Sequence, residues 1–176
     1  KVLASANTNI GGVDTITGDE GDDVLVGGAF GDTLHGNDGS DLILGDSGTI
    51  DYVGTGPVDG ILNQVLSTTE AIGDADTITG DLGNDTILGG AAGDSIHGDA
   101  GADWILGDAG QLDYTGGDLR TVTSTASGVG GVDTVDGDAD NDTIVGGAAG
   151  DTLHGNLGDD VLFGDEATIT LEGGVR

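Results

Sequence analysis

The chain lacks the residues that several common classes of protein require. It has no cysteine, which excludes a disulfide scaffold. It has only one proline. Its only basic residues are Lys1, Arg120 and Arg176, so no basic face exists for nucleic acid or an anionic membrane. No apolar run approaches the ~20 residues that a membrane-spanning helix needs. We therefore expect neither nucleic-acid binding nor membrane insertion.

Acidic residues and glycine dominate what is present. The 176 residues include 33 acidic side chains against three basic ones, a formal net charge of −30, and 38 glycines. With only 3% aromatic residues, such a chain has little apolar surface to offset its conformational entropy, so the metal-free chain is expected to be disordered. The acids recur at one position of a repeat, however, where a divalent cation could neutralise them and hold successive turns together.

The repeat is nine residues long and reads Gly-x-x-Gly-x-Asp-x-apolar-x. It is clearest in residues 18–26 (GDEGDDVLV) and 80–88 (GDLGNDTIL), and each aspartate stands two residues before an aliphatic one. A period of nine fits a flattened solenoid in which six residues turn and three form a strand. Twelve such units in register predict an all-β solenoid.

These units resemble the RTX, or haemolysin-type, calcium-binding nonapeptide repeat family. The resemblance implies a parallel β-roll with Ca²⁺ bound in both rows of turns, and a product that a Gram-negative bacterium exports by type I secretion. It assigns calcium binding to the sixth-position aspartates, with about three ions per module and weaker outermost sites. These residues are Asp14, Asp23, Asp32, Asp41, Asp76, Asp85, Asp94, Asp103, Asp133, Asp142, Asp151 and Asp160.

Shifting the sequence along itself divides the chain into three modules. The predicted boundaries are a partial insert (1–8), a first roll (9–53), an insert (54–70), a second roll (71–115), an insert (116–127), a third roll (128–172) and a partial insert (173–176). Val2–Ile10 aligns with Gln64–Ile72 without gaps, which suggests a window on a longer tandem array. Because the insert lengths are not multiples of nine, we expect the inserts to loop out, as ordered structure or as floppy connections.

Each module ends in a fifth unit that keeps the strand but has Ile50, Leu112 or Ile169 in place of the aspartate. Without a carboxylate the row of metal sites should stop there, so this unit is interpreted as a terminator. In a β-roll, units one, three and five should stack on one side and units two and four on the other.

The outward-facing residues of the two sides differ. The first side is polar: Thr15, Thr17, Thr33, His35, Thr77, Thr79, Ser95, His97, Thr134, Asp136, Thr152 and His154. The second side is apolar and needs a cover, with Thr86 and Thr143 as its polar members: Val24, Val26, Leu42, Leu44, Leu88, Trp104, Leu106, Val145, Val161 and Phe163. That cover is either the inserts of the same chain or a second chain, in which case the face would mediate self-association into fibres.

Three further groups leave alternatives open. The second-position acids either add outer calcium ligands or only solvate the rim of the turns: Asp19, Asp46, Asp81, Asp99, Asp108, Asp138 and Asp165. Phe30, Ala92 and Ala149 stand where the repeat prefers glycine, as does Asp140, and should resist a positive φ. The equivalent histidines His35, His97 and His154 are interpreted as isolated, solvent-facing side chains rather than a transition-metal site.

The motifs of an enzyme are missing from the sequence. It contains no His-Glu-x-x-His motif and no Gly-x-Ser-x-Gly elbow, so we expect no catalytic activity. Three functions remain: a structural region of an adhesin, biofilm-matrix or filament protein that becomes rigid on binding calcium; a carrier region of a secreted enzyme or toxin; and ice or carbohydrate binding through the threonines. The interrupted threonine pattern disfavours the last.

Overall fold

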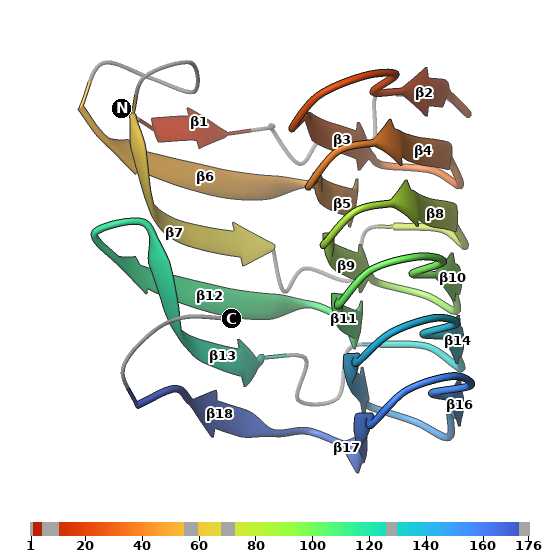
Figure 1. Cartoon of the computed structure of the whole chain (residues 1–176). Coiled ribbons are helices and arrows are strands. Elements are labelled where there is room, and N and C mark those ends of the chain that lie inside the picture. Colours follow the sequence, from red (N-terminus) through yellow and green to blue (C-terminus); the bar gives the residue numbers. More distant parts are fainter. Residues whose placement is uncertain (1, 5–10, 55–59, 68–72, 126–129, 173–176) are drawn as a thin grey trace.

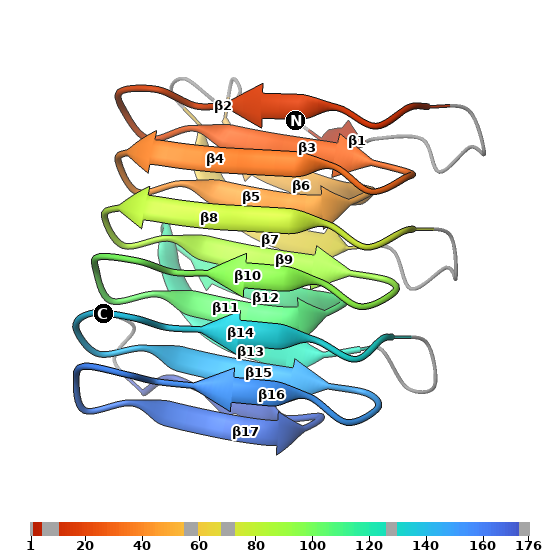
Figure 2. The same cartoon turned by 90° about the vertical axis from the view of Figure 1, so that its right-hand side faces the viewer.

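The computed structural model describes residues 2–4, 11–54, 60–67, 73–125 and 130–172. All regular structure in these residues is β, in three six-stranded sheets that lie one behind another (Figure 2). The parts of the predicted inserts in 5–8, 55–59, 68–70, 126–127 and 173–176 lie outside the described residues. No helix in the described part of the chain is long and apolar enough to cross a membrane.

The first sheet, here called the polar sheet, is parallel and contains the first and third repeat units of each module. Its strands are β2 (Thr15–Thr17), β4 (Thr33–Asp38), β8 (Thr77–Leu82), β10 (Ser95–His97), β14 (Thr134–Asp136) and β16 (Thr152–His154). The second, here called the apolar sheet, is also parallel: β3 (Val24–Gly28), β5 (Leu42–Asp46), β9 (Thr86–Gly90), β11 (Trp104–Asp108), β15 (Thr143–Gly147) and β17 (Val161–Asp165). Together they form the predicted β-roll.

The eighth residue of each repeat points into the roll. Within a sheet these residues align directly, as Leu34 does with Ile78 and Ile43 with Ile87. The resulting core is fully buried along its middle, where Ile78, Ile87 and Ile105 are all 0% exposed. Each strand contributes one side chain to this core, so three residues between glycine-rich turns are enough to build the roll.

The third sheet, here called the cover sheet, is antiparallel and packs on the apolar sheet. It consists of β1 (Val2–Ala4), β6 (Gly48–Val53), β7 (Ile61–Ser67), β12 (Gly110–Thr115), β13 (Asp118–Ser124) and β18 (Thr168–Thr170), and Figure 1 shows it beside the roll. Val65 and Val122 from the inserts meet Leu44, Trp104 and Leu106 of the apolar sheet in a second core. The described parts of the inserts are thus ordered, and the cover lies within the chain.

The fifth unit does not join the polar sheet, and that expectation was wrong. Ile50, Leu112 and Ile169 lie in β6, β12 and β18 of the cover sheet. Without an aspartate to close the sixth position of a turn, the chain runs straight on from the apolar sheet into the cover. After each insert it returns to begin the next turn, so the roll continues through the modules by β4–β8 and β5–β9 pairing.

The proposed assembly face is correspondingly covered along most of its length. Leu42, Leu44, Leu88, Trp104, Leu106 and Val145 are buried, while Val24, Val161 and Phe163 at the two ends of the stack remain about two-fifths or more exposed. The middle of this face is therefore buried under the chain's own cover sheet.

Truncation of the cover core is expected to destabilise the whole molecule. Leu112→Ala removes a side chain that is 0% exposed in β12 and should lower the free energy of unfolding by about 2–5 kcal/mol. Val53→Ala, at a position 59% exposed on β6 of the same sheet, should change it by less than about 0.5 kcal/mol. Denaturant unfolding in calcium measures the free energy of unfolding of both variants. Equal losses in the two variants would argue against the second core.

Candidate calcium-binding turns

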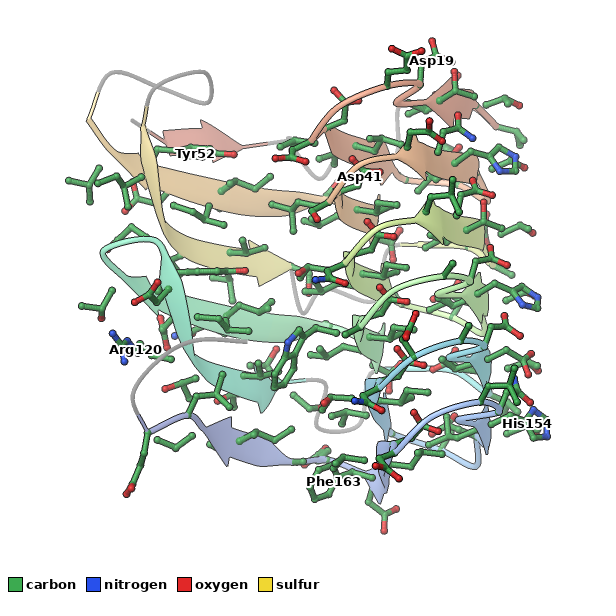
Figure 3. All side chains as sticks on the ribbon, in the orientation of Figure 1. Asp19, Asp41, Tyr52, Arg120, His154 and Phe163 are labelled. Atoms are coloured by element: carbon green, nitrogen blue, oxygen red, sulfur yellow. The ribbon has the colours of Figure 1, made fainter. Side chains whose placement is uncertain are left out.

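The sixth-position aspartates form two straight rows, one in each set of turns. One row contains Asp14, Asp32, Asp76, Asp94, Asp133 and Asp151, and the other contains Asp23, Asp41, Asp85, Asp103, Asp142 and Asp160. Figure 3 shows oxygen-rich side chains gathered along the turns, with Asp19 and Asp41 labelled. The predicted candidates are thus brought together as two ladders.

Within each ladder the backbone joins one carboxylate to the next. The N–H of Asp76 donates to Oδ1 of Asp94 at 2.8 Å, and the N–H of Asp103 donates to Oδ1 of Asp142 at 2.9 Å. The same bond spans an insert, from the N–H of Asp32 to Oδ1 of Asp76 at 2.6 Å. The interpretation of the fifth unit as a terminator of the ladder was therefore wrong.

The second carboxylate oxygen has no protein partner in most of these turns. Oδ2 is buried without a hydrogen bond in Asp23, Asp32, Asp41, Asp76, Asp85, Asp94, Asp103, Asp133 and Asp151. A buried ionised oxygen without a donor or counter-ion is costly. Its recurrence at one turn position indicates a ligand that the polypeptide does not supply.

Backbone carbonyls face the same space. A Cβ atom placed on Gly18 would lie 2.9 Å from Oδ2 of Asp23 and 2.6 Å from the carbonyl oxygen of Gly36 in the next turn. In the other row, a Cβ on Gly146 would lie 2.6 Å from Oδ2 of Asp151 and 2.7 Å from the carbonyl oxygen of Gly164. The glycines keep open a space between oxygen donors, and carboxylate and carbonyl oxygens are the ligands that Ca²⁺ prefers.

Burial changes the acidity of these groups when no cation is bound. Desolvation raises the pKa of Asp94 to about 9, that of Asp103 to about 8 and that of Asp85 to about 7. Repulsion from the preceding carboxylate in the ladder adds to the increase, and the backbone hydrogen bond to Oδ1 opposes it. The metal-free roll therefore resists ionisation of its own ligands.

Acid is expected to stabilise the calcium-free roll. In the folded chain these carboxyls have a pKa of about 7–9, against 3.8 in the unfolded chain. The protonated groups therefore stabilise the folded state fully below pH 3.8, and this stabilisation is lost as the pH rises through 7–9. In chelator, lowering the pH from about 8 to about 5 should raise β-sheet content, measured by far-UV circular dichroism. With calcium present, β-sheet content should instead be higher at about pH 8 than at about pH 5, because protons compete with the cation for the carboxylates. Calcium-free ellipticity that is unchanged or falls on acidification would contradict the assignment.

The second-position acids separate into two groups. Asp46 and Asp108 are buried where the chain leaves the roll. Oδ2 of Asp46 accepts the N–H of Ala91 at 2.6 Å, and Oδ1 of Asp108 accepts the N–H of Gly131 at 3.1 Å. Each carboxylate thus ties the point of departure to neighbouring turns, a role that sequence reasoning missed because it depends on where the inserts leave and return.

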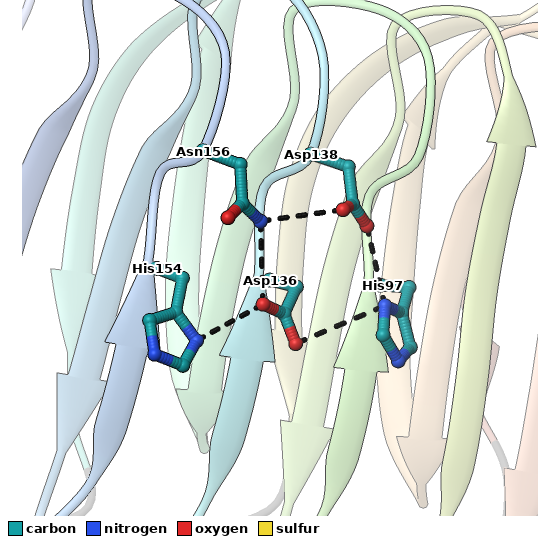
Figure 4. Close-up of polar contacts among 5 residues, drawn as sticks. All are labelled: His97, Asp136, Asp138, His154 and Asn156. Atoms are coloured by element: carbon teal, nitrogen blue, oxygen red, sulfur yellow. Dashed lines mark hydrogen bonds and ion pairs between the residues drawn. The ribbon is translucent and has the colours of Figure 1, made fainter.

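Asp19, Asp81, Asp99 and Asp138 lie at the rim of the turns beside the polar sheet, whereas Asp165 ends β17 of the apolar sheet. Asp138 accepts hydrogen bonds from Asn156 and contacts His97, whose Nδ1 lies 3.2 Å from Oδ2 (Figure 4). His154 Nδ1 lies 3.0 Å from Oδ1 of Asp136. The histidines face solvent as predicted, but they are not isolated, because parallel stacking places them in one row on the polar sheet.

The residues that replace glycine do adopt the left-handed backbone. Phe30, Ala92, Asp140 and Ala149 have φ of 92°, 72°, 78° and 82°. Their resistance to this conformation is real but does not prevent the turn, because hydrogen bonds and strand stacking on both sides hold it.

Glycine at such a position is expected to stabilise the roll. Ala149→Gly relieves a positive φ at an exposed site and should raise the free energy of unfolding by about 0.5–1 kcal/mol. Ala148→Gly, one residue earlier without a positive φ, should lower it by a similar amount because it only adds freedom to the unfolded chain. Denaturant midpoints in calcium measure the stability of both variants. A loss of stability in both would contradict the claim that the positive φ strains Ala149.

The turns do not resemble a transition-metal centre. No three histidine or acidic side chains converge on one point anywhere in the described ranges. Most intervals between turns instead combine a carboxylate with a backbone carbonyl, which suits a hard cation. A row of fifth-position residues also braces these turns, since Oδ1 of Asn84 accepts the N–H of Ala102 at 2.8 Å.

Comparison with known proteins agrees with this geometry. A family model described as the RTX calcium-binding nonapeptide repeat matches four times, over residues 11–34, 17–49, 79–111 and 127–162, which together exceed half of the chain. No curated protein matches the chain significantly. On the strength of these matches and of the parallel roll, the chain belongs to the RTX family of calcium-binding nonapeptide repeats.

Proposed function

We propose that this chain is a structural region of an extracellular adhesin, biofilm-matrix or filament protein, which folds and becomes rigid when calcium fills its two carboxylate ladders. The family is one of calcium-binding repeats and is typical of Gram-negative proteins secreted by the type I route. The observation that carries the proposal is the row of buried Oδ2 atoms without a partner in successive turns.

All twelve sixth-position aspartates are proposed as ligands, because every one of them stands in a ladder. For every one except Asp14, Oδ2 lies within 2.9 Å of the place where a Cβ atom on a described turn glycine would stand, as for Asp41 at Gly36 and Asp133 at Gly107. The ladders run through the modules, so the ions should occupy successive intervals between turns and should not stop at the end of each module. The bound cation would supply the positive charge that three basic residues cannot.

Two features favour a rigid structural spacer over a carrier region of a secreted enzyme or toxin. The roll is continuous across modules, and the inserts brace its apolar side with an antiparallel sheet. A carrier would need only reversible folding, whereas a spacer benefits from a second core along its length. In a calcium-poor cytosol the acidic chain would stay unfolded and ready for export, and external calcium would drive folding because it binds only the native state.

Small-angle X-ray scattering during a calcium titration tests this role. The radius of gyration should fall from about 45 Å for the unfolded chain to about 16 Å for the folded one. The midpoint should lie near about 0.1–1 mM, the range of extracellular calcium modules. Magnesium is the matched control, since it prefers a smaller octahedral site and keeps its waters. Equal compaction in chelator, or in magnesium alone, would overturn the proposal.

A further inference from the structure

A hollow opens at one edge of the space between the apolar sheet and the cover sheet. The chain itself closes the other edge, because it crosses there from β5 into β6 and from β11 into β12. At the open edge the apolar strands begin, and β6 and β12 end. The hollow has a volume of about 530 Å³, within the range of ~300–1,000 Å³ that is typical of small-molecule sites.

Two tyrosines, a leucine and a threonine form the inner wall of this hollow. Tyr52 and Tyr114 reach it from β6 and β12 of the cover sheet, and Leu42 and Thr86 face it from the apolar sheet. Figure 3 shows Tyr52 on the side of the cover sheet. The hydroxyl of Tyr114 is hydrogen-bonded to Thr86, which fixes the tyrosine across the two sheets. The inner wall therefore presents ring and aliphatic carbon atoms in fixed positions.

The extent of the hollow follows from one column of the apolar sheet. Leu42, Thr86 and Trp104 are neighbours in register on β5, β9 and β11. Leu42 and Thr86 line the hollow, whereas the larger Trp104 is buried in the second core and the hollow ends before it. The edge is thus open where this column carries smaller side chains and filled where it carries an indole.

A row of fifth-position residues forms the outer rim. Oδ1 of Asp22 accepts the N–H of Ser40 at 2.9 Å, and Oγ of Ser40 accepts the N–H of Asn84 at 3.3 Å. Oδ1 of Asn84 is used in the same way by the next turn. Within the described residues, these bonds leave Oδ2 of Asp22 as an acceptor and the Ser40 hydroxyl and Asn84 amide as donors. The rim therefore offers one acceptor and two donors beside an apolar wall.

The charges of the lining select the class of ligand. Among the described residues that line the hollow, the charged ones are Asp22, Asp23 and Asp41, so an anion is repelled. Calcium in the ladders would neutralise Asp23 and Asp41 and leave the rim carboxylate of Asp22. A purely apolar ligand would leave the rim donors and acceptor unpaired. A hexose fits, since its ring carbons can pack on tyrosine and leucine while its hydroxyls both donate and accept.

We propose that this hollow binds one neutral hexose unit of a polysaccharide. The inner wall packs against the C–H face of the sugar ring, and Asp22, Ser40 and Asn84 bind its hydroxyls. The inference deepens the proposed function and rests on it, because calcium must fold the two sheets before the hollow exists. A sugar site would let a region of an adhesin or matrix protein attach to a polysaccharide, and it does not involve the threonines of the polar sheet.

Saturation-transfer difference NMR on the full chain in calcium tests the site. The probes are the methyl glycosides of glucose, galactose and mannose, with spermidine as a cationic probe. At least one glycoside should receive saturation at its ring C–H protons and bind with a Kd of about 1 mM or lower. Spermidine should not compete with it.

An exchange of one rim atom locates the hydroxyl contacts. Asn84→Asp keeps the oxygen that accepts the N–H of Ala102 but replaces the amide donor, so the Kd should rise about tenfold or more. Asn141→Asp is the matched control, because Oδ1 of Asn141 accepts the N–H of Asp159 at 2.7 Å in the same way, away from the hollow. The control should bind the glycoside as the wild-type chain does.

A second exchange fills the hollow. Thr86→Trp copies the neighbouring Trp104 in the same column and should abolish binding. Thr77→Trp places the same side chain at the equivalent repeat position of the polar sheet, where Thr77 is exposed, and should leave binding unchanged. Circular dichroism in calcium first checks that each variant folds, and if Thr86→Trp does not fold, the two asparagine variants decide.

The outcomes separate the sugar site from the proposed function. A wild-type chain that folds in calcium but transfers saturation to none of the glycosides overturns the sugar site alone. Binding of spermidine in place of the glycosides, or equal weakening by Asn84→Asp and Asn141→Asp, overturns it as well. A wild-type chain that does not fold in calcium overturns the proposed function.

Discussion

Chelation of calcium is expected to unfold the entire chain in one transition. The folded state buries a ladder of carboxylates whose Oδ2 atoms have no protein donor, so without the cation each turn retains an unfavourable group. A site that binds only the native state adds about 2.7 kcal/mol when calcium stands at 100 times its Kd. Four such sites already exceed about 10 kcal/mol, a typical total for a folded domain.

The tryptophan reports this transition directly. Trp104, the only tryptophan in the chain, is 7% exposed between the apolar and cover sheets. Its fluorescence should shift to the red in chelator at the same calcium concentration at which the β-sheet signal is lost. Coincident curves would show that the cover sheet and the roll fold as one unit. Retention of the buried emission in chelator would contradict the prediction.

Asp94→Asn is expected to have opposite effects with and without calcium. In calcium the variant loses a charged ligand in the middle of a ladder, and the calcium concentration needed for folding should rise by about tenfold for that interval, equivalent to about 1.4 kcal/mol. In chelator it relieves a buried acid whose pKa is raised to about 9, a penalty on the order of 2–4 kcal/mol near pH 7.

A calcium titration and a stabilising osmolyte measure the two effects. In calcium the midpoint of folding comes from circular dichroism. In chelator, where the chain is unfolded, the variant should fold at a lower concentration of trimethylamine oxide than the wild type. Asp118→Asn removes one charge from an exposed position of β13 and is the matched control. An Asp94→Asn chain that is less stable under both conditions would show that the carboxylate has a purely structural role.

The repeat predicts the roll because its spacing determines both strand and turn. Each aspartate is followed two residues later by a core side chain, and this pattern was sufficient to assign Ile78 and Ile105 to the interior. The difference between the two outer faces was equally visible, since one is rich in threonine and the other in leucine and valine. The need for a cover followed from exposed apolar area alone.

The destination of the fifth unit could not be derived in the same way. Ile50 has the periodicity of a roll strand, and its transfer to the cover sheet depends on its pairing with Val65 from the insert. The sequence also places His97 and His154 in different modules, whereas the returning chain puts them on either side of Asp136. Contacts made by the inserts are long-range, and a nine-residue period carries no information about them.

The most direct test is a crystal structure with calcium, in which anomalous scattering locates the ions. The ladders predict peaks beside Oδ2 in the turns, including the intervals from Asp41 to Asp85 and from Asp94 to Asp133, which cross the two inserts. Peaks in these intervals would establish one continuous metal ladder through the three modules. Ions confined within single modules, or absent from the turns, would contradict it.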